Sequence, residues 1–445
     1  MNVNRFSEDL IGLKKFATEL EDFIKVEKRF VEGSLVISLN APFGSGKTTF
    51  LKMWKNEIKN QSPKDSQPIV VDLNAWESDY YGDPLFAIIS GIIESIKEKG
   101  KKLENLISAA KKVGRTFVTL GNQLVAKTTG INALEVAEST KEKREQDFAP
   151  DTFTTYEKRK KAMSHLKECI KDFVNGHQPF VLFLVDELDR CRPDYAISYL
   201  ETVKHLFDCQ GAVFLIAADR HQLKCSAKSA YGEDLNFDEY YRKFIHREAT
   251  LPAMSAQSCR MITEEYVETY FTNNGERSCR MNIRESTKAI VELIEAFKPT
   301  FRQIQEIFRI VGHLSETSTD QNGGIDYGTG CIIVLMSLLK VNAPAMFDRL
   351  GTQRCSPQEA HDFLKQHLSD ERVFQWFGML LNSGAVEVKK NLSPDEFLKT
   401  IGISTRREQE NEAFLHAYNT YQHNPYGLRI CTQVYTKITQ LSKWH

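Results

Sequence analysis

Near the start of the chain, two glycines are followed by a lysine and two threonines, and the spacing of these residues suits phosphate binding. Gly44 and Gly46 would let the backbone turn several N–H groups toward an anion, and a helix beginning here would add the positive end of its dipole. Lys47 would reach the terminal phosphates, and Thr48 would offer its hydroxyl to Mg²⁺. The residues expected to line the phosphates are Pro42, Phe43, Gly44, Ser45, Gly46, Lys47, Thr48 and Thr49.

The segments on either side of this loop support that interpretation. Ser34–Asn40 is short, apolar and rich in β-branched residues, which predicts a strand buried on both faces of a sheet. From Lys47 onward, apolar residues recur at helical spacing. Ala41 stands where the pattern usually begins with glycine. A glycine-containing turn with an incidental Lys-Thr pair is the alternative, and the strand-loop-helix context disfavours it.

Two adjacent acids follow a second apolar run. Val181–Val185 predicts a buried strand, and Asp186 and Glu187 come directly after it. Ligands of parallel sheets bind at the carboxyl ends of the strands. We therefore expect Asp186 to hold Mg²⁺ and Glu187 to polarise an attacking water molecule. Acids at this place could also merely stabilise the N-terminus of a following helix. Their combination with Lys47 favours a role in nucleotide hydrolysis.

The same residues favour hydrolysis of a nucleotide over its use as a phosphoryl donor. A further apolar run, Ile69–Leu73, predicts an extra strand between the two motifs, which nucleotide kinases usually lack. A glutamate beside the magnesium aspartate suits activation of water. A kinase for a small acceptor remains the competing enzyme class. A nucleotide-binding scaffold without activity is disfavoured because Lys47, Thr48, Asp186 and Glu187 are all present.

Apolar strands alternate with helical patterns as far as Ala212–Ala218, which predicts an α/β fold with a parallel sheet covered by helices on both faces. Phe6–Phe30 is expected to form the first helix, with Leu10, Leu13, Phe16, Leu20, Phe23 and Phe30 on its apolar side. The expected domains are a core over 1–251 with a helical insertion at about 100–155, a helical segment over 252–316 and an α-helical C-terminal domain over 330–445. Within the insertion, the polar segment Thr128–Asp151 is expected to be mobile.

Several motifs together resemble the KAP family of P-loop NTPases. The resemblance extends from about residue 6 to residue 315 and includes the phosphate-binding loop. It is carried by Asn74-Ala75-Trp76-Glu77, Asp83-Pro84-Leu85, Asp186-Glu187-Leu188-Asp189-Arg190-Cys191, Ala217-Ala218-Asp219-Arg220, Glu239-Tyr240-Tyr241-Arg242-Lys243-Phe244 and Phe301-Arg302-Gln303-Ile304-Gln305.

The resemblance implies an ATPase core with a helical lid over 252–316, related to the STAND and AAA-type ATPases, which often act as signalling switches or oligomers. ATP and Mg²⁺ are the implied cofactors. Many family members carry transmembrane helices between the two nucleotide motifs, whereas the insertion here lacks the apolar length. Prokaryotic members often belong to antiphage defence systems, so this is the biological role we expect.

The resemblance also suggests roles for several arginines. Arg302 in the lid would read the γ-phosphate, and Arg242 would act as a finger on a neighbour's nucleotide. Solvated arginines at helix ends are the alternative for both. Arg190 and Arg192 form a second candidate finger pair.

Two further segments are candidates for contact with the nucleotide. Trp76 and Glu77 follow the second predicted strand and could line the γ-phosphate side, although a tryptophan in this place favours core packing. Asp9–Gly12 resembles the segment that holds adenine in related ATPases.

Composition limits the partners and the compartment. The formal net charge is -1, so any contact with nucleic acid must come from a local patch. Nine scattered cysteines without a CxxC pair favour a reducing cytosol. The longest apolar run, Cys331–Leu339, is about half of what a membrane span needs. We expect a cytoplasmic homo-oligomer that acts on a separately encoded partner protein without membrane contact, and the alternative is a nucleic-acid-stimulated ATPase.

Overall fold

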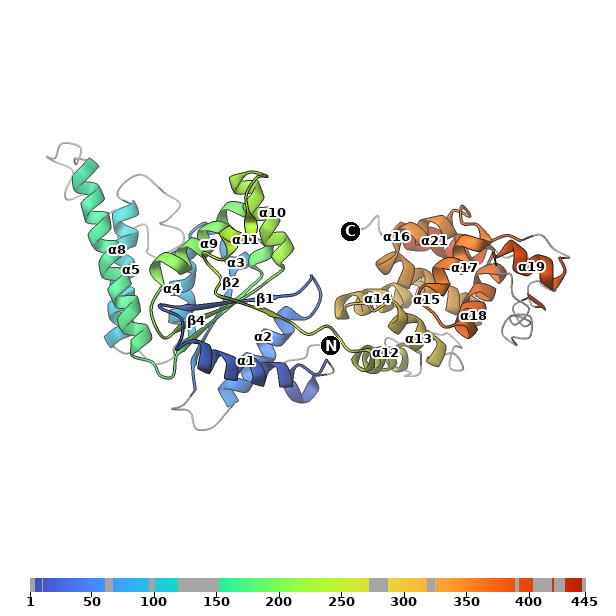
Figure 1. Ribbon diagram of the computed structural model, residues 1–445, viewed down its shortest axis with the longest axis horizontal. Helices are drawn as coiled ribbons and strands as arrows, with labels where there is room; N and C mark the ends of the chain where they lie inside the picture. Colours follow the sequence, from blue (N-terminus) through green and yellow to red (C-terminus); the bar gives the residue numbers. More distant parts are fainter. Residues whose placement is uncertain are drawn as a thin grey trace. The chain divides into compact units, whose positions relative to one another are not determined.

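The computed structural model forms two compact units, Met1–Ala253 and Met254–His445, and each is described by itself (Figure 1). The structure describes residues 5–9, 11–60, 67–95, 101–118, 152–271, 287–317, 325, 327–388, 392–402, 418–419 and 429–441. The predicted polar insertion Thr128–Asp151 lies outside these residues. The predicted subdivision of the second unit into a lid and a C-terminal domain stays a prediction.

The first unit is built on a five-stranded parallel sheet with the strand order β2-β3-β4-β1-β5. Asn74 at the end of β2 is in register with Asp186 at the end of β3, and Asp186 is in register with Ala217 of β4. The carboxyl ends of neighbouring strands are therefore level, so side chains there can meet. The strands are β1 Leu35–Asn40, β2 Ile69–Asn74, β3 Val181–Asp186, β4 Ala212–Ala218 and β5 Arg247–Thr250.

Two separate apolar clusters cover the two faces of this sheet. Leu182 and Leu184 of β3 belong to the cluster packed under α1 and α2. Phe183 and Val185 belong to the cluster that includes residues of α4, α5, α8 and α9. This period-two alternation along a fully buried strand is what a parallel sheet covered on both faces requires. The predicted fold class is confirmed.

The helices of the first unit lie where apolar residues recur every three to four positions. Pro193 begins α9 at a position where a missing N–H costs nothing. The elements are η1 Phe6–Glu8, α1 Lys14–Glu27, α2 Lys47–Asn60, α3 Ala75–Asp79, α4 Pro84–Ser95, α5 Lys101–Val118, α8 Thr152–Asn175, η3 Leu188–Arg190, α9 Pro193–Leu206, α10 Arg220–Tyr231 and α11 Phe237–Tyr241.

The predicted first helix, Phe6–Phe30, is wrong in its limits. Helix α1 begins only at Lys14, because the side chain of Asp9 accepts the N–H groups of Ile11, Gly12 and Leu13 and holds a turn there. Phe30 lies beyond the end of the helix and is 76% exposed, and Phe23 is 40% exposed. Ala17 and Ile24 occupy the buried face together with the predicted Leu13 and Leu20. Leu10 lies outside the described residues.

The second unit is helical throughout its described part, apart from short connections. Helix α15 is buried along Gly330–Leu339, which explains the longest apolar run of the sequence. Among the described helices, none has both the length and the apolar character that a membrane span requires. The helices are α12 Ala256–Phe271, α13 Thr287–Ala296, α14 Phe301–Thr317, α15 Tyr327–Asn342, α16 Pro344–Gly351, α17 Pro357–Lys365, α18 Asp370–Asn382, α19 Pro394–Thr400 and α21 Ile430–Leu441.

The turn at Asp9 offers a test of this arrangement. Replacing Asp9 by alanine removes the acceptor for three backbone N–H groups ahead of α1. We expect the free energy of unfolding to fall by about 1 kcal/mol, as for other lost helix caps. Asp9→Asn keeps an acceptor and should lose less. Urea denaturation with Asp22→Ala, an exposed acid of α1, as the control measures this, and equal losses for Asp9→Ala and Asp22→Ala would contradict it.

Candidate active site

The loop between β1 and α2 has the backbone conformation that its sequence predicts. Gly44 and Gly46 have φ values of 79° and 96°, in the region that favours glycine. Ala41 is buried and does not have a positive φ. The first position of the loop therefore makes no demand that only glycine can meet, which explains why alanine is tolerated there.

The lysine of the loop is held inside the site by the loop itself. Lys47 Nζ donates to the carbonyl oxygen of Ala41 at 2.6 Å and lies 3.5 Å from Asp189 Oδ2. Asp189 also accepts the backbone N–H of Asp219 at 2.7 Å, so it joins the loop to the segment that follows β4. Both side chains are more than nine-tenths buried. No role was predicted for Asp189, although its place two residues after Glu187 was a usable signal.

The two acids predicted after β3 have different environments. Asp186 accepts the N–H of Glu187 at 2.9 Å and is hydrogen-bonded to the side chain of Thr48. Burial raises the pKa of the Asp186 carboxyl above its ordinary value, and the bond from Thr48 partly opposes this shift. A carboxylate and a threonine hydroxyl in contact at the edge of the sheet make up the pair that the loop predicted for a divalent cation.

This pair fits Mg²⁺ in the manner of a phosphate-binding site. Magnesium usually takes one or two protein oxygens and completes its shell with water and substrate phosphate oxygens. Among the described residues, no group of three or more His, Cys, Asp or Glu side chains could hold a metal ion by itself. Thr48 and Asp186 therefore suit a cation that arrives with a nucleotide rather than one bound in an all-protein cage.

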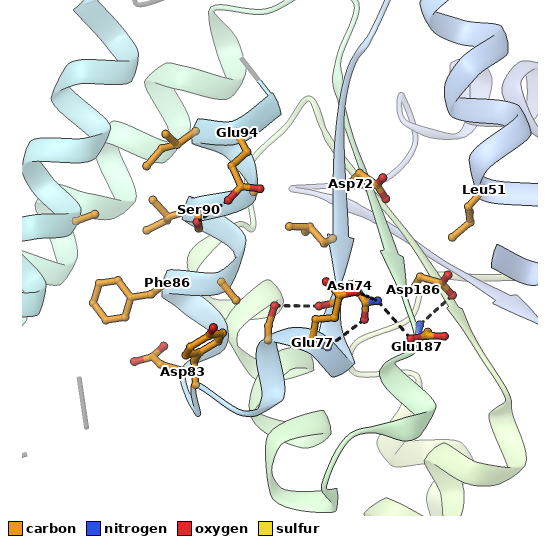
Figure 2. Close-up of a pocket in the computed structure, with 18 of the residues that line it drawn as sticks. Leu51, Asp72, Asn74, Glu77, Asp83, Phe86, Ser90, Glu94, Asp186 and Glu187 are labelled. Atoms are coloured by element: carbon orange, nitrogen blue, oxygen red, sulfur yellow. Dashed lines mark hydrogen bonds between the residues drawn. The ribbon is translucent and has the colours of Figure 1, made fainter. Parts of the chain in front are cut away.

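Glu187 has an unusual backbone conformation, and two neighbours hold its carboxylate. Its φ of 61° lies in the left-handed region, which is uncommon for glutamate and is often found at functional sites. Asn74 Nδ2 donates to one carboxylate oxygen at 3.3 Å, and Arg190 Nη2 lies 2.9 Å from the other. Figure 2 shows Asn74 beside both Glu77 and Glu187, with Asp186 next to them.

Asn74 orients the carboxylate of Glu187, a role that was not predicted from the sequence. Its Oδ1 accepts the N–H groups of Trp76 and Glu77, so it caps α3. Its Nδ2 is thereby turned toward Glu77 and Glu187. An asparagine between a strand and a helix is a common capping signal, but the sequence alone does not show that its amide also reaches the next strand.

Arg190 lies between aromatic rings, and this corrects the expectation for Trp76. Its guanidinium is 5.9 Å from the ring of Phe43 and 5.5 Å from the ring of Trp76. Trp76 is 52% exposed, so the expectation of core packing was wrong. Arg190 pairs with Glu187 within its own chain, and Arg192 pairs with Asp79 at 2.9 Å. In this conformation both candidate finger residues have acidic partners in the same chain.

A cavity of about 980 Å³ opens from the acids toward α4. Thr48, Asp186 and Glu187 line one end of it. Figure 2 shows Asp72, Asn74 and Glu77 at the strand side of the cavity, and Asp83, Phe86, Ser90 and Glu94 at the α4 side. The cavity leaves room for water and a ligand next to Glu187.

The remaining candidates lie outside this group of contacts. Arg242 is exposed at the end of α11, and Arg302 is exposed in the first turn of α14, in the second unit. The roles suggested for these two arginines stay predictions. At the expected adenine segment, Ile11 lies against the loop, with its Cδ1 3.6 Å from where a Cβ on Gly46 would stand.

Burial of Asp186 leads to a prediction about pH. A carboxyl whose folded pKa is raised supports stability below its ordinary pKa of about 4, and this support is lost as pH rises through the folded pKa. In the absence of nucleotide, Asp186→Asn should therefore melt at a higher temperature than wild type at pH 8, with the difference shrinking as the pH falls. Thermal melts across pH measure this.

The control for that experiment is Asp72→Asn, which changes an exposed acid of β2. It should show no such gain at high pH. A wild-type protein as stable as Asp186→Asn at pH 8 would contradict the stated cost of burying this carboxylate.

The family that this chain matches is one of P-loop domains, in agreement with the phosphate-binding loop described above. A profile of the KAP family P-loop domain matches residues 13–317. No curated protein sequence matches the chain. Among solved structures, the Aeropyrum pernix ORC2 protein in its ADPNP–ADP complexes is 12% identical, covering 97% of this chain and 86% of that chain with a TM-score of 0.38.

The Aeropyrum pernix ORC1 protein in complex with DNA is 13% identical and covers 93% of both chains, also with a TM-score of 0.38. Similarity at this level carries no information about function. The family profile, in contrast, covers more than half of the chain and includes both the phosphate-binding loop and the two acids after β3. The chain therefore belongs to the KAP family of P-loop domains.

Proposed function

We propose that this protein hydrolyses ATP in a Mg²⁺-dependent reaction, with Glu187 as the residue that activates water. The observation that carries the proposal is the position of the Glu187 carboxylate. It lies at the same sheet edge as the Thr48–Asp186 pair and is held by Asn74 and Arg190. A hydrolase needs a base beside the phosphate site, whereas a kinase needs a place for an acceptor.

Lys47 and the loop amides would bind the phosphates. In the conformation described, the positive charge of Lys47 is balanced by the Ala41 carbonyl oxygen and by the Asp189 carboxylate. Phosphate oxygens would take over these contacts, and the amides around Gly44 and Gly46 would surround the anion. Charge that develops on the transferred group would then face a positive, largely buried side chain.

Thr48 and Asp186 would hold the magnesium ion. When bound, Mg²⁺ would neutralise part of the charge on the phosphate oxygens. Glu187 would accept a proton from the attacking water, with its carboxylate oriented by the amide of Asn74. The neighbouring cavity, lined in part by Glu77, gives water access to this carboxylate.

Hydrolysis would drive a conformational switch in a cytoplasmic homo-oligomer that acts on a separately encoded partner, in prokaryotic antiphage defence. Family membership supports this proposal.

Arg302 would sense the γ-phosphate from the helical lid, and Arg242 would act on a neighbour's nucleotide; both are exposed and available for such contacts. Particle mass measured with and without ATP tests the oligomer, and stimulation by DNA or RNA would favour the nucleic-acid-dependent alternative.

Glu187→Gln tests the central assignment. The amide keeps the size of the side chain but cannot accept the proton, so turnover should fall about 10²-fold or more while ATP binding is retained. The matched control is Glu94→Gln, which changes an exposed carboxylate of α4, and it should stay within about threefold of wild type. Lys47→Ala should lose ATP binding.

Steady-state ATP turnover and equilibrium nucleotide binding measure these effects separately. Undiminished turnover by Glu187→Gln would exclude it as the base. Transfer of phosphate to a small acceptor that survives in Glu187→Gln would support the kinase alternative.

Arg190 is expected to position Glu187. Arg190→Ala removes the ion pair and the contacts with Phe43 and Trp76. We expect kcat to fall about tenfold with little change in ATP affinity, and Arg190→Lys to recover part of the loss. Arg192→Ala is the matched control, because it breaks a similar ion pair with Asp79 that does not involve Glu187. Equal kcat losses in the two alanine variants would contradict a specific role for Arg190.

A further inference from the structure

Helices α5 and α8 form a strongly basic surface in a protein that is nearly neutral. Among the side chains that the structure describes in these two helices, eight are lysine or arginine and four are acidic, a net charge of +4, whereas the whole chain carries -1. The two helices pack against each other and lie side by side at one edge of the first unit (Figure 1). We call α5 and α8 the basic helix pair.

The lysines of this pair are accessible and largely uncompensated. Seven of them are exposed: Lys111, Lys112, Lys158, Lys160, Lys161, Lys167 and Lys171. Lys112 has a partner, and Lys167 and Lys171 interact electrostatically with Cys209. Within the described part of the chain, no ion pair involves Lys111, Lys158, Lys160 or Lys161. Elsewhere in the unit, lysines such as Lys25 and Lys55 form ion pairs with acids. The positive charge of the helix pair is therefore available to an external anion.

The charge is concentrated far from the sheet. Lys158, Arg159, Lys160 and Lys161 lie in the N-terminal half of α8, where Glu157 is the single acid. The other acids of α8, Glu168 and Asp172, lie in its C-terminal half. Since α8 ends at Asn175, shortly before β3, the run from Lys158 to Lys161 lies about 21 to 26 Å along the helix from that end.

The chemistry of this surface distinguishes between anionic partners. Among the described residues of the pair, Tyr156 is the one large apolar or aromatic side chain that is exposed. Membrane-surface helices combine basic residues with an apolar face that enters the lipid, and single-stranded nucleic acids are bound by several stacked aromatic rings. Neither feature is present on the described surface. Binding to the phosphate backbone of a duplex needs only an array of accessible cations.

We propose that the basic helix pair is a binding surface for the phosphate backbone of double-stranded DNA, without preference for base sequence. Of its seven exposed lysines, Lys111 lines the cavity beside Glu187, whereas Lys158, Lys160 and Lys161 are not among the residues that line this cavity. This proposal does not depend on the proposed hydrolysis, because binding to the pair requires neither Lys47 nor Glu187. It also reconciles a net charge near zero with a nucleic-acid partner, since the charge is local.

The test measures binding of the full chain to a fluorescein-labelled duplex of about 30 base pairs by anisotropy, without nucleotide, between about 50 and about 200 mM salt. Wild type should bind with an affinity that falls steeply with salt. The triple variant Lys158→Gln/Lys160→Gln/Lys161→Gln should bind at least about tenfold more weakly, and its salt slope should be smaller by about 2 to 3.

The matched control removes the same charge from another exposed helix. Lys14→Gln/Lys15→Gln/Lys25→Gln changes three lysines of α1 that are ion-paired with Glu57, Glu19 and Glu21. It should bind the duplex within about threefold of wild type. ATP turnover without DNA should be the same in both triple variants and wild type, which keeps failure of this proposal distinct from failure of the ATPase assignment.

Three outcomes would overturn the proposal. Equal weakening in both triple variants would show that net charge alone matters. Stronger binding to a single strand of the same length would place the affinity in stacking rather than in backbone contacts. Binding to phosphatidylserine vesicles, with no measurable affinity for the duplex, would identify a membrane surface instead.

Discussion

The register between β2 and β3 is the constraint on which the site depends. Because Asn74 and Asp186 occupy the same level in neighbouring strands, the amide of one strand end can reach the carboxylate that follows the other. A shift of one residue would turn alternate side chains to the opposite face of the sheet. The two apolar clusters would then be disrupted together with the site, so packing of the core and placement of Glu187 are secured by the same contacts.

A second connection runs through the buried charges. Lys47 and Asp189 are both largely removed from water, and such a pair is stabilising only when further hydrogen bonds satisfy its remaining atoms. Here the Ala41 carbonyl and the Asp219 N–H provide them. The phosphate-binding loop, the end of β3 and the end of β4 are thereby joined. A disturbance at any of these three places would change the electrostatic surroundings of the other two.

Much of this could be predicted from the sequence, because local patterns determine it. Buried strands appear in the sequence as short apolar runs. For this reason the strand Ala212–Ala218 was predicted with its observed limits. The start of α1 was missed because a single Asp9 side chain overrides the helical periodicity. The hydrogen bond from Asn74 to Glu187 and the contact of Arg190 with the Trp76 ring join residues that lie far apart in the sequence. Periodicity contains no information about contacts of this kind.

Helix α8 has a mechanical consequence. It is a single helix of 24 residues whose C-terminal end leads, after a short connection, into the strand that carries Asp186. A helix of this length is stiff, and the strand it precedes is buried on both faces. A force applied at the outer turns of α8 would therefore be transmitted to the start of β3, at Val181. It would reach Asp186 only through the length of this buried strand.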